Sequence, residues 1–204
     1  MGLITGLTSK TPQNILLGAG AFFKNYDVKK DTPETAQAKL LGATQGGGSF
    51  NAVPTVRQIT VDGGKTNIKE LETIDDWVVT MVANAKEITA NNIALALGAA
   101  KIEDSEAPEG YHRITGKEDF EQSDYQDNIT WIGTLKGSTK PVIIILKNAL
   151  SLNGLSLSVA DKSEATVPIT LTGHYSLENL KEVPFEIIYP KGETASAEPV
   201  TNEE

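Results

Sequence analysis

The chain has 204 residues, a net charge of -9 and no cysteine, and 39% of its residues are hydrophobic. A chain of this length can bury one sizeable core, so a single domain is expected. The composition is typical of a folded protein and not of a disordered one. The acid excess disfavours a nucleic-acid-binding protein, and the missing cysteines exclude a disulfide framework, a thiolate metal site and a cysteine nucleophile.

The first expected strand lies near residues 15–23, where apolar residues are interrupted by Gly18 and Gly20. Residues 26–54 keep no regular period apart from a brief helical turn predicted at 36–41, so we expect a long irregular loop. This loop contains a glycine run, Gly46, Gly47 and Gly48, followed by Phe50. The run is not a phosphate loop, because no predicted strand leads into it and no helix or lysine follows.

Regular structure is predicted again from residue 56. Residues 56–61 alternate, "DGG" at 62–64 predicts a turn, and 77–85 read as a mostly buried strand. "TANNIALALGA" predicts a short helix that Thr89 caps and Gly98 ends. Residues 101–128 carry nine acids against three basic residues, and we expect an acidic connection with a short strand near 111–114.

The final third reads as strands. "NITWIGTLKGSTKPVIIIL" predicts a hairpin around the "KGST" turn, and "GLSLSV", "TVPITLTGHY" and "PFEIIYP" predict further strands. We therefore expect residues 1–190 to form one mainly β domain, a β-sandwich or split β-barrel of about seven to eight strands with one short flanking helix. Residues 191–204 have too few apolar side chains to order themselves and are predicted to be a disordered polar tail.

No catalytic signature is present. His112 and His174 lie far apart without carboxylate or cysteine partners at ligand spacing, and no nucleophile-elbow, zincin or P-loop motif occurs. Neighbouring acids such as Asp75 and Asp76 are commonplace at the start of a strand. We expect no enzyme activity, no cofactor and no metal, and no apolar run is long enough to insert into a membrane.

Five stretches taken in order resemble the major tail tube proteins of long-tailed, siphovirus-type bacteriophages and prophages of Gram-positive bacteria. They span about residues 13–190: "NILLGAGAFFKNYD", "LGATQGGGSFNAVPTVRQITVDG", "EITANNIALALGAA", "DNITWIGTLKGSTKPVIIIL" and "VPITLTGHYSLENLKEVPFEIIYP". The resemblance implies a structural protein that assembles with itself into stacked hexameric rings. These rings form a tube through which DNA passes during ejection without specific binding.

The resemblance also implies partners and a location. A tail tube subunit contacts the tape measure protein and the tail tip and terminator proteins, and it resides in the virion tail after synthesis in the host bacterial cytoplasm. The family's long loop reaches a neighbouring subunit, and we assign that role to residues 26–54, with Gly46, Gly47 and Gly48 lying flat on the partner and Phe50 as the anchor.

Residues 56–128 hold seven Lys or Arg against fifteen Asp or Glu, a balance of -8. An acidic lumen would keep DNA sliding, and strand side chains face inward at every second position of a closed sheet. We therefore predict that Glu70, Glu72, Asp75 and Asp76 face the lumen, and that the acids between Glu103 and Asp127 lie outside.

Two other readings remain open. The inner tube protein of a contractile tail or of a secretion-type injection device shares the tube architecture. A monomeric β-sandwich binding module is a different class, which usually shows clustered exposed aromatics, whereas aromatics form only 6% of this chain.

Overall fold

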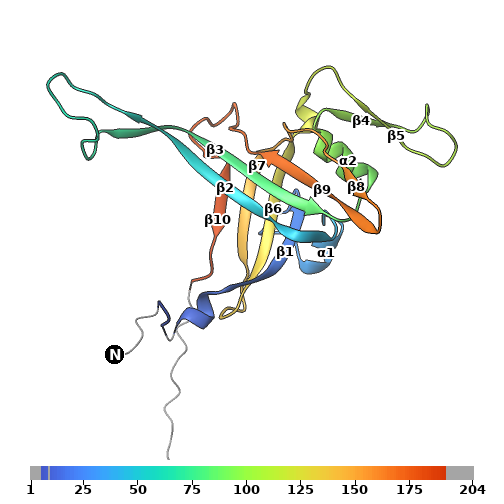
Figure 1. Ribbon diagram of the computed structural model, residues 1–204, viewed down its shortest axis with the longest axis horizontal. Helices are drawn as coiled ribbons and strands as arrows, with labels where there is room; N and C mark the ends of the chain where they lie inside the picture. The colour runs from blue at the N-terminus through green and yellow to red at the C-terminus, as the bar shows by residue number, and fades with distance from the viewer. Residues whose placement is uncertain (1–5, 9, 192–204) are drawn as a thin grey trace, which may run out of the picture.

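Two facing sheets make up most of the computed structural model, which describes residues 6–8 and 10–191 (Figure 1). The first sheet has the order β1-β6-β7-β10, built from Leu16–Lys24, Gln126–Leu135, Val142–Ala149 and Phe185–Ile188. The second has the order β2-β3-β9-β8, built from Thr44–Gln58, Glu72–Ala85, Ser163–Thr172 and Ser158–Ala160. A separate hairpin pairs β4, Ala100–Glu103, with β5, Arg113–Gly116. The predicted β-sandwich with a short flanking helix is confirmed.

Helix α2, Ala90–Leu97, begins and ends where its caps predict. The Thr89 side chain accepts a hydrogen bond from the Asn92 amide at 3.2 Å, and Gly98 ends the helix with a φ of 77°. The buried Asn92 side chain donates to the backbone carbonyls of Leu41 and Glu87, at 2.8 and 2.9 Å. These two bonds attach the helix to the chain that enters and leaves the second sheet.

Three shorter helical pieces lie in the connections. They are the 3-10 turn η1, Thr11–Asn14, the helix α1, Pro33–Gln37, and the 3-10 turn η2, Gln122–Asp124. The helical turn predicted at 36–41 thus forms slightly earlier in the chain.

The core lies between the sheets and follows the period of two expected for strands. Phe22, Ile129 and Leu146 point inward from the first sheet, and Val79, Met81, Ile169 and Leu171 do so from the second; each is at most 2% exposed. Burial of each such side chain contributes about 1.5–3 kcal/mol to stability. Strand β7 is apolar on both faces, because Ile143 and Ile145 on its other face are also buried.

The prediction that residues 26–54 form an irregular loop is wrong from Thr44 onward. Residues 44–58 form β2, which pairs with β3 from Thr44 to Gln58 with irregularities between Thr44 and Gly48 and between Thr55 and Val56. A Cβ on Gly48 would lie 2.0 Å from the Val82 carbonyl oxygen and 2.6 Å from Phe22 Cζ, so a side chain has no room there. The glycine run therefore allows close packing between β2 and the core.

Two further expectations need correction. The alternation in "GLSLSV" does not form a strand at Leu155 or Leu157, and only the exposed Ser158–Ala160 pairs with β9. The acidic connection at 101–128 has the short strand expected near 111–114, as β5, and it also contains η2 and most of β4, which were not predicted. The described chain has ten strands rather than seven or eight. Of the predicted polar tail, only Lys191 lies within the described residues.

Candidate assembly surface

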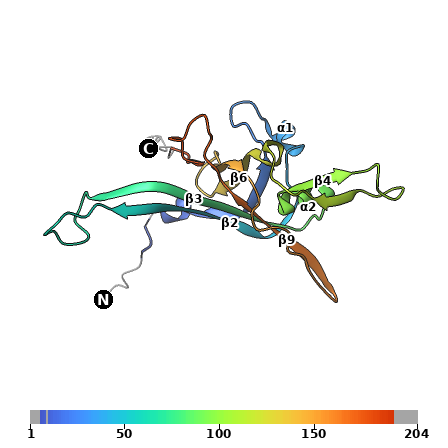
Figure 2. The same cartoon turned by 90° about the horizontal axis from the view of Figure 1, so that it is seen from above.

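The hairpin formed by β2 and β3 projects well beyond the sandwich (Figures 1 and 2). β3 pairs with β9 only from Thr80 to Ala85, whereas β2 follows it from Thr44 to Gln58. The outer part, residues 53–78, is therefore a ribbon of two strands and a tip, which we call the arm. A two-stranded ribbon is marginally stable in water by itself, so the arm lacks the support that the rest of the sheet has.

The arm exposes apolar side chains on both faces. Val53 lies opposite Val78, and three residues further along β2 Val56 lies opposite Ile74, which places the two pairs on opposite faces of the ribbon. Seven large aliphatic side chains of the arm have exposed fractions from 38% to 59%: Val53, Val56, Ile59, Val61, Ile68, Ile74 and Val78. Exposed apolar residues gathered on one projecting element are typical of a surface that contacts another protein.

The four acids predicted to face a lumen are all found on the arm. Glu70 lies at the tip with a φ of 73°, and Glu72 begins β3. Asp75 occupies an irregularity in the pairing opposite Thr55 and Val56, where it forms an ion pair with Arg57. The structure therefore brings these acids together on one element, and their orientation toward a lumen stays a prediction.

Asp76 belongs to the base of the arm. Its carboxylate and the Tyr175 hydroxyl both accept hydrogen bonds from the Trp77 amide, at 2.6 and 3.1 Å. Burial raises the pKa of Tyr175, and the hydrogen bond with Asp76 raises it further. This contact joins the arm to the segment that follows β9.

The residues predicted to touch a neighbour have contacts within their own chain. Gly48 pairs with Ala83 on β3. The ring centroid of Phe185 lies 5.9 Å from that of Phe50 and 5.3 Å from that of Trp77. Phe50 thus belongs to the edge of the sandwich core. A contact of Gly46, Gly47 or Phe50 with another subunit stays a prediction.

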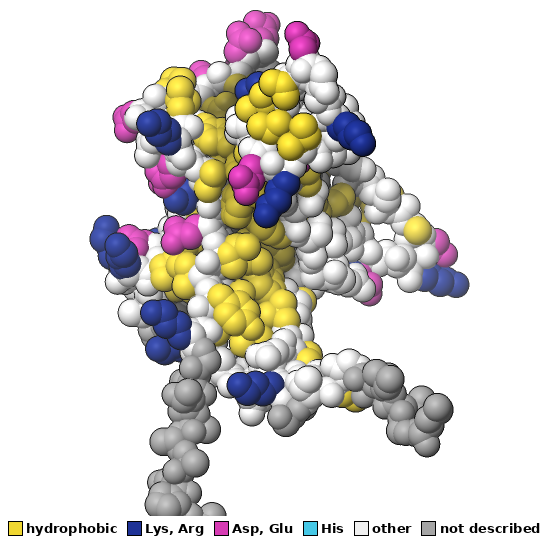
Figure 3. Space-filling view, turned by 90° about the vertical axis from the view of Figure 1, so that its left-hand side faces the viewer, with side chains coloured by type: hydrophobic (Ala, Val, Ile, Leu, Met, Phe, Trp, Pro, Cys, Tyr) yellow, Lys and Arg dark blue, Asp and Glu magenta, His cyan; other side chains and the backbone are white. Residues whose placement is uncertain are grey.

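Phe50 also lines an apolar groove at the open side of the sandwich. The groove measures about 180 Å³ and is lined by Leu16, Phe22, Gly48, Ser49, Phe50, Met81, Trp131 and Ile144. Leu16 is 47% exposed at its rim. Figure 3 shows that apolar side chains form a continuous band down one face of the molecule. The arm projects toward the viewer in Figure 3, so this band includes part of the arm. Sequence reasoning missed the groove and the arm, because alternation does not reveal which strands extend beyond their partners.

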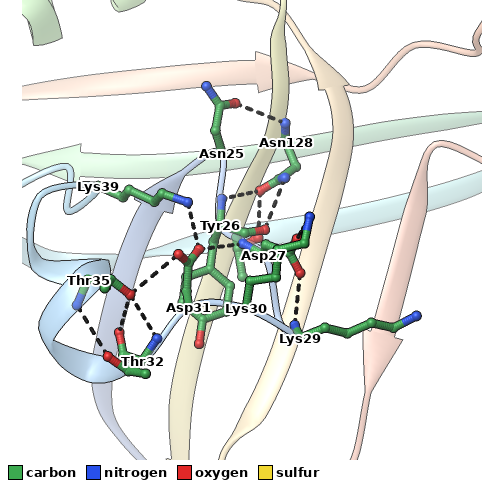
Figure 4. Close-up of polar contacts among 11 residues, drawn as sticks. Asn25, Tyr26, Asp27, Lys29, Lys30, Asp31, Thr32, Thr35, Lys39 and Asn128 are labelled. Carbon is green, nitrogen blue, oxygen red and sulfur yellow. Dashed lines mark hydrogen bonds and ion pairs between the residues drawn. The ribbon is translucent and has the colours of Figure 1, made fainter.

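A polar strap, residues 25–31, covers part of the outer face of the first sheet (Figure 4). The Asn128 side chain accepts a hydrogen bond from the Tyr26 amide at 3.0 Å and donates one to the Tyr26 carbonyl at 3.2 Å. Asp31 accepts from the Asp27 amide at 2.6 Å and from Lys39 Nζ at 2.7 Å. Lys39, together with the Asp27 amide, lowers the pKa of Asp31. These bonds attach the strap to Asn128 on β6 and to Lys39.

The two histidines make ordinary polar contacts. His112 Nδ1 lies 2.7 Å from an Asp104 carboxylate oxygen on the exposed β4–β5 hairpin, and His174 Nδ1 lies 3.0 Å from the Asn148 carbonyl oxygen. Among residues 6–8 and 10–191, no group of three or more His, Asp or Glu side chains could hold a metal ion.

The chain matches no family model, and comparison with curated proteins gave no similar sequence. None of the helices in the described part of the chain is long and apolar enough to cross a membrane.

Proposed function

We propose that this protein is a structural subunit of a phage tail tube, which assembles with itself into stacked hexameric rings that conduct DNA during ejection. The single observation that carries the proposal is the arm, where no third strand among the described residues pairs with the ribbon and aliphatic side chains are exposed on both faces. A ribbon of this kind gains stability when a second chain covers it.

The fold supports the same role. Two sheets with a short helix are the architecture that the resemblance to tail tube proteins implies. In this role the protein is made in the host bacterial cytoplasm and resides in the virion tail, where it contacts the tape measure, tip and terminator proteins. The inner tube protein of a contractile tail or injection device is the closest alternative, and the arm would serve assembly there too.

The experiment compares self-association of the wild type with that of an arm variant, Val56→Ser/Ile74→Ser, by light scattering and negative-stain electron microscopy across a range of concentrations. We expect rings or tubes from the wild type and only monomers from the variant, because the serines remove apolar surface on which the contact depends. Val159→Ser on β8 is the matched control, since that side chain is 77% exposed but lies off the arm.

Two results would contradict the proposal. Wild-type protein that stays monomeric at every concentration would favour the monomeric β-sandwich binding module. Assembly of the arm variant at wild-type concentrations would show that the arm does not hold the subunits together.

A further inference from the structure

Charge is separated along strand β6. The acidic segment at 101–127 leads into the start of this strand at Gln126, and Lys136 follows its last residue, Leu135. Ten extended residues place the two ends of the strand about 30 Å apart. In Figure 1 the β4–β5 hairpin accordingly lies at the upper right, and the yellow β6–β7 turn lies at the bottom.

The lower end of the molecule is uniformly basic. The η1 segment packs on the β6–β7 turn, where the Lys136 and Gly137 amides donate to the carbonyls of Ile15 and Gln13, at 3.0 and 2.9 Å. β10 runs antiparallel to β7 with Ile188 opposite Ile143, so residues 189–191 leave the sheet at this same end. The segments that meet here, 10–17, 133–142 and 188–191, contain no acid. We call their four exposed lysines the basic end: Lys10, Lys136, Lys140 and Lys191.

These lysines lack charged partners in the described part of the chain. Every ion pair formed by residues 6–8 and 10–191 involves other basic residues, such as Lys117 and Lys147. Four exposed charges of one sign at one end repel one another, and an opposite charge brought against them from outside relieves that repulsion.

The opposite end carries the complementary charge. Residues 101–127 include nine acidic and three basic residues, which gives this segment a charge balance of -6. Lys101, Arg113 and Lys117 are already paired with acids of this same segment. Glu109, Glu118 and Asp119 are exposed and have no ion-pair partner among the described residues. We call the segment 101–127 the acidic end.

We propose that the basic end binds the acidic end of a second copy of this chain, so that copies join head to tail along the direction of β6. This inference rests on the proposed self-assembly and assigns it a polarity. Unlike ends attract and like ends repel, so only one relative orientation of two copies is favoured. Since both surfaces are exposed, screening acts over about 8 Å at physiological ionic strength, and the contact weakens as salt rises.

The test uses two charge-reversed variants measured by sedimentation velocity at low ionic strength. Lys136→Glu/Lys140→Glu leaves the basic end with no net charge, and Glu118→Lys/Asp119→Lys reduces the charge balance of the acidic end from -6 to -2. Each variant alone is expected to associate at least about tenfold more weakly than wild type, because the attraction between the two ends is lost or reduced. Mixing the two variants restores association. Lys162→Glu reverses one exposed charge between β8 and β9, outside both ends and the arm, and leaves association unchanged.

The outcomes separate this inference from the proposed function. Wild-type tubes that both reversals leave intact, with no dependence on salt, would overturn the head-to-tail contact and leave the tube proposal standing. Salt-sensitive association of the mixed variants without any ring or tube would support the contact and count against the tube.

Two other molecules or segments could occupy the basic end, namely residues 192–204 and DNA, and each is tested separately. Residues 192–204 carry four glutamates, and a chain ending at Lys191 is expected to associate at least as strongly as wild type. Loss of association in that shorter chain would assign the basic end to the tail segment. Binding of a DNA duplex that is abolished by Lys136→Glu/Lys140→Glu, with self-association unchanged, would make it a nucleic-acid site and overturn the proposal.

Discussion

Arg57 on β2 and Asp75 on β3 form a two-point ion pair across the arm, with Nε 2.9 Å from one carboxylate oxygen and a terminal guanidinium nitrogen 3.1 Å from the other. The pair sits where the strand pairing is irregular and where no third strand supports the ribbon. Its geometry is the planar, two-bond match that arginine makes with a carboxylate. Asp75 therefore joins the two strands of the arm, independently of whether its side chain also faces a lumen.

Replacement of Asp75 by Asn is expected to loosen the arm without melting the sandwich. The amides of residues 55–58 and 72–76 exchange with deuterium faster in the variant, while the melting temperature stays within error of wild type, because both side chains are largely exposed. Lys69→Ala serves as control, since Lys69 and Glu70 lie 3.9 Å apart and are almost fully exposed. Equal exchange in wild type and Asp75→Asn would show that the pair does not order the arm.

Gly48→Ala is expected to destabilise the monomer. The new methyl group meets the Val82 carbonyl oxygen and the Phe22 ring, so strands or core must move apart, at a cost of about 1–3 kcal/mol. Chemical denaturation measures the change. Gly116→Ala is the matched control in a strand, because its Cβ has only the Ala99 carbonyl oxygen within 4 Å, at 3.9 Å. An unaltered free energy of unfolding for Gly48→Ala would mean that β2 does not pack here.

Asn92→Ala is expected to lower the free energy of unfolding by about 1–3 kcal/mol, because the carbonyls of Leu41 and Glu87 lose their hydrogen-bond donor in a buried site. The neighbouring Asn91 is exposed on the same helix, so Asn91→Ala should change stability little. The two variants, compared by denaturation, isolate the buried amide from helix propensity. Similar values for both would contradict the role assigned to Asn92.

The strap has a defined pH dependence. The pKa of Asp31 is lowered below its ordinary value of 3.8, chiefly by the hydrogen bond from Lys39. Its stabilising contribution is therefore fully present above that ordinary value and is lost as the pH falls through the lowered one. The stability difference between wild type and Asp31→Asn, measured by denaturation from pH 7 downward, should shrink in this acid range. A stability difference that is constant with pH would contradict the role of Asp31.

The sequence predicted the features that depend on local chemistry. Thr89 and Gly98 bound α2 because an N-cap hydroxyl and a C-terminal glycine act within one turn. The "KGST" turn joined β6 to β7 for the same reason. The prediction of a loop at the glycine run was wrong because glycine has no side chain and therefore shows no alternation of polar and apolar residues. Strand β2 forms there because it pairs with β3, more than thirty residues away in the sequence.

Features set by distant partners could not be predicted. Leu155 and Leu157 alternate like a strand, but Ser158 is the first residue that pairs with β9, and Gly154 turns the chain with a φ of 70°. The turn at 62–64 was predicted, but the projection of the arm follows from β9 ending its pairing opposite Thr80. Glu70, Glu72, Asp75 and Asp76 all lie on the arm, and the surface that they face in an assembly depends on contacts between chains.

The long strand β3 has a mechanical consequence. Its fourteen residues run without interruption from the tip region of the arm into the centre of the second sheet. A pull on the arm along this strand would load its hydrogen bonds to β2 and β9 in shear, all at once, because those bonds lie perpendicular to the strand. Tension between neighbouring chains would thus pass directly into the best-packed part of the molecule, so that stretching an assembly would be resisted by the core itself.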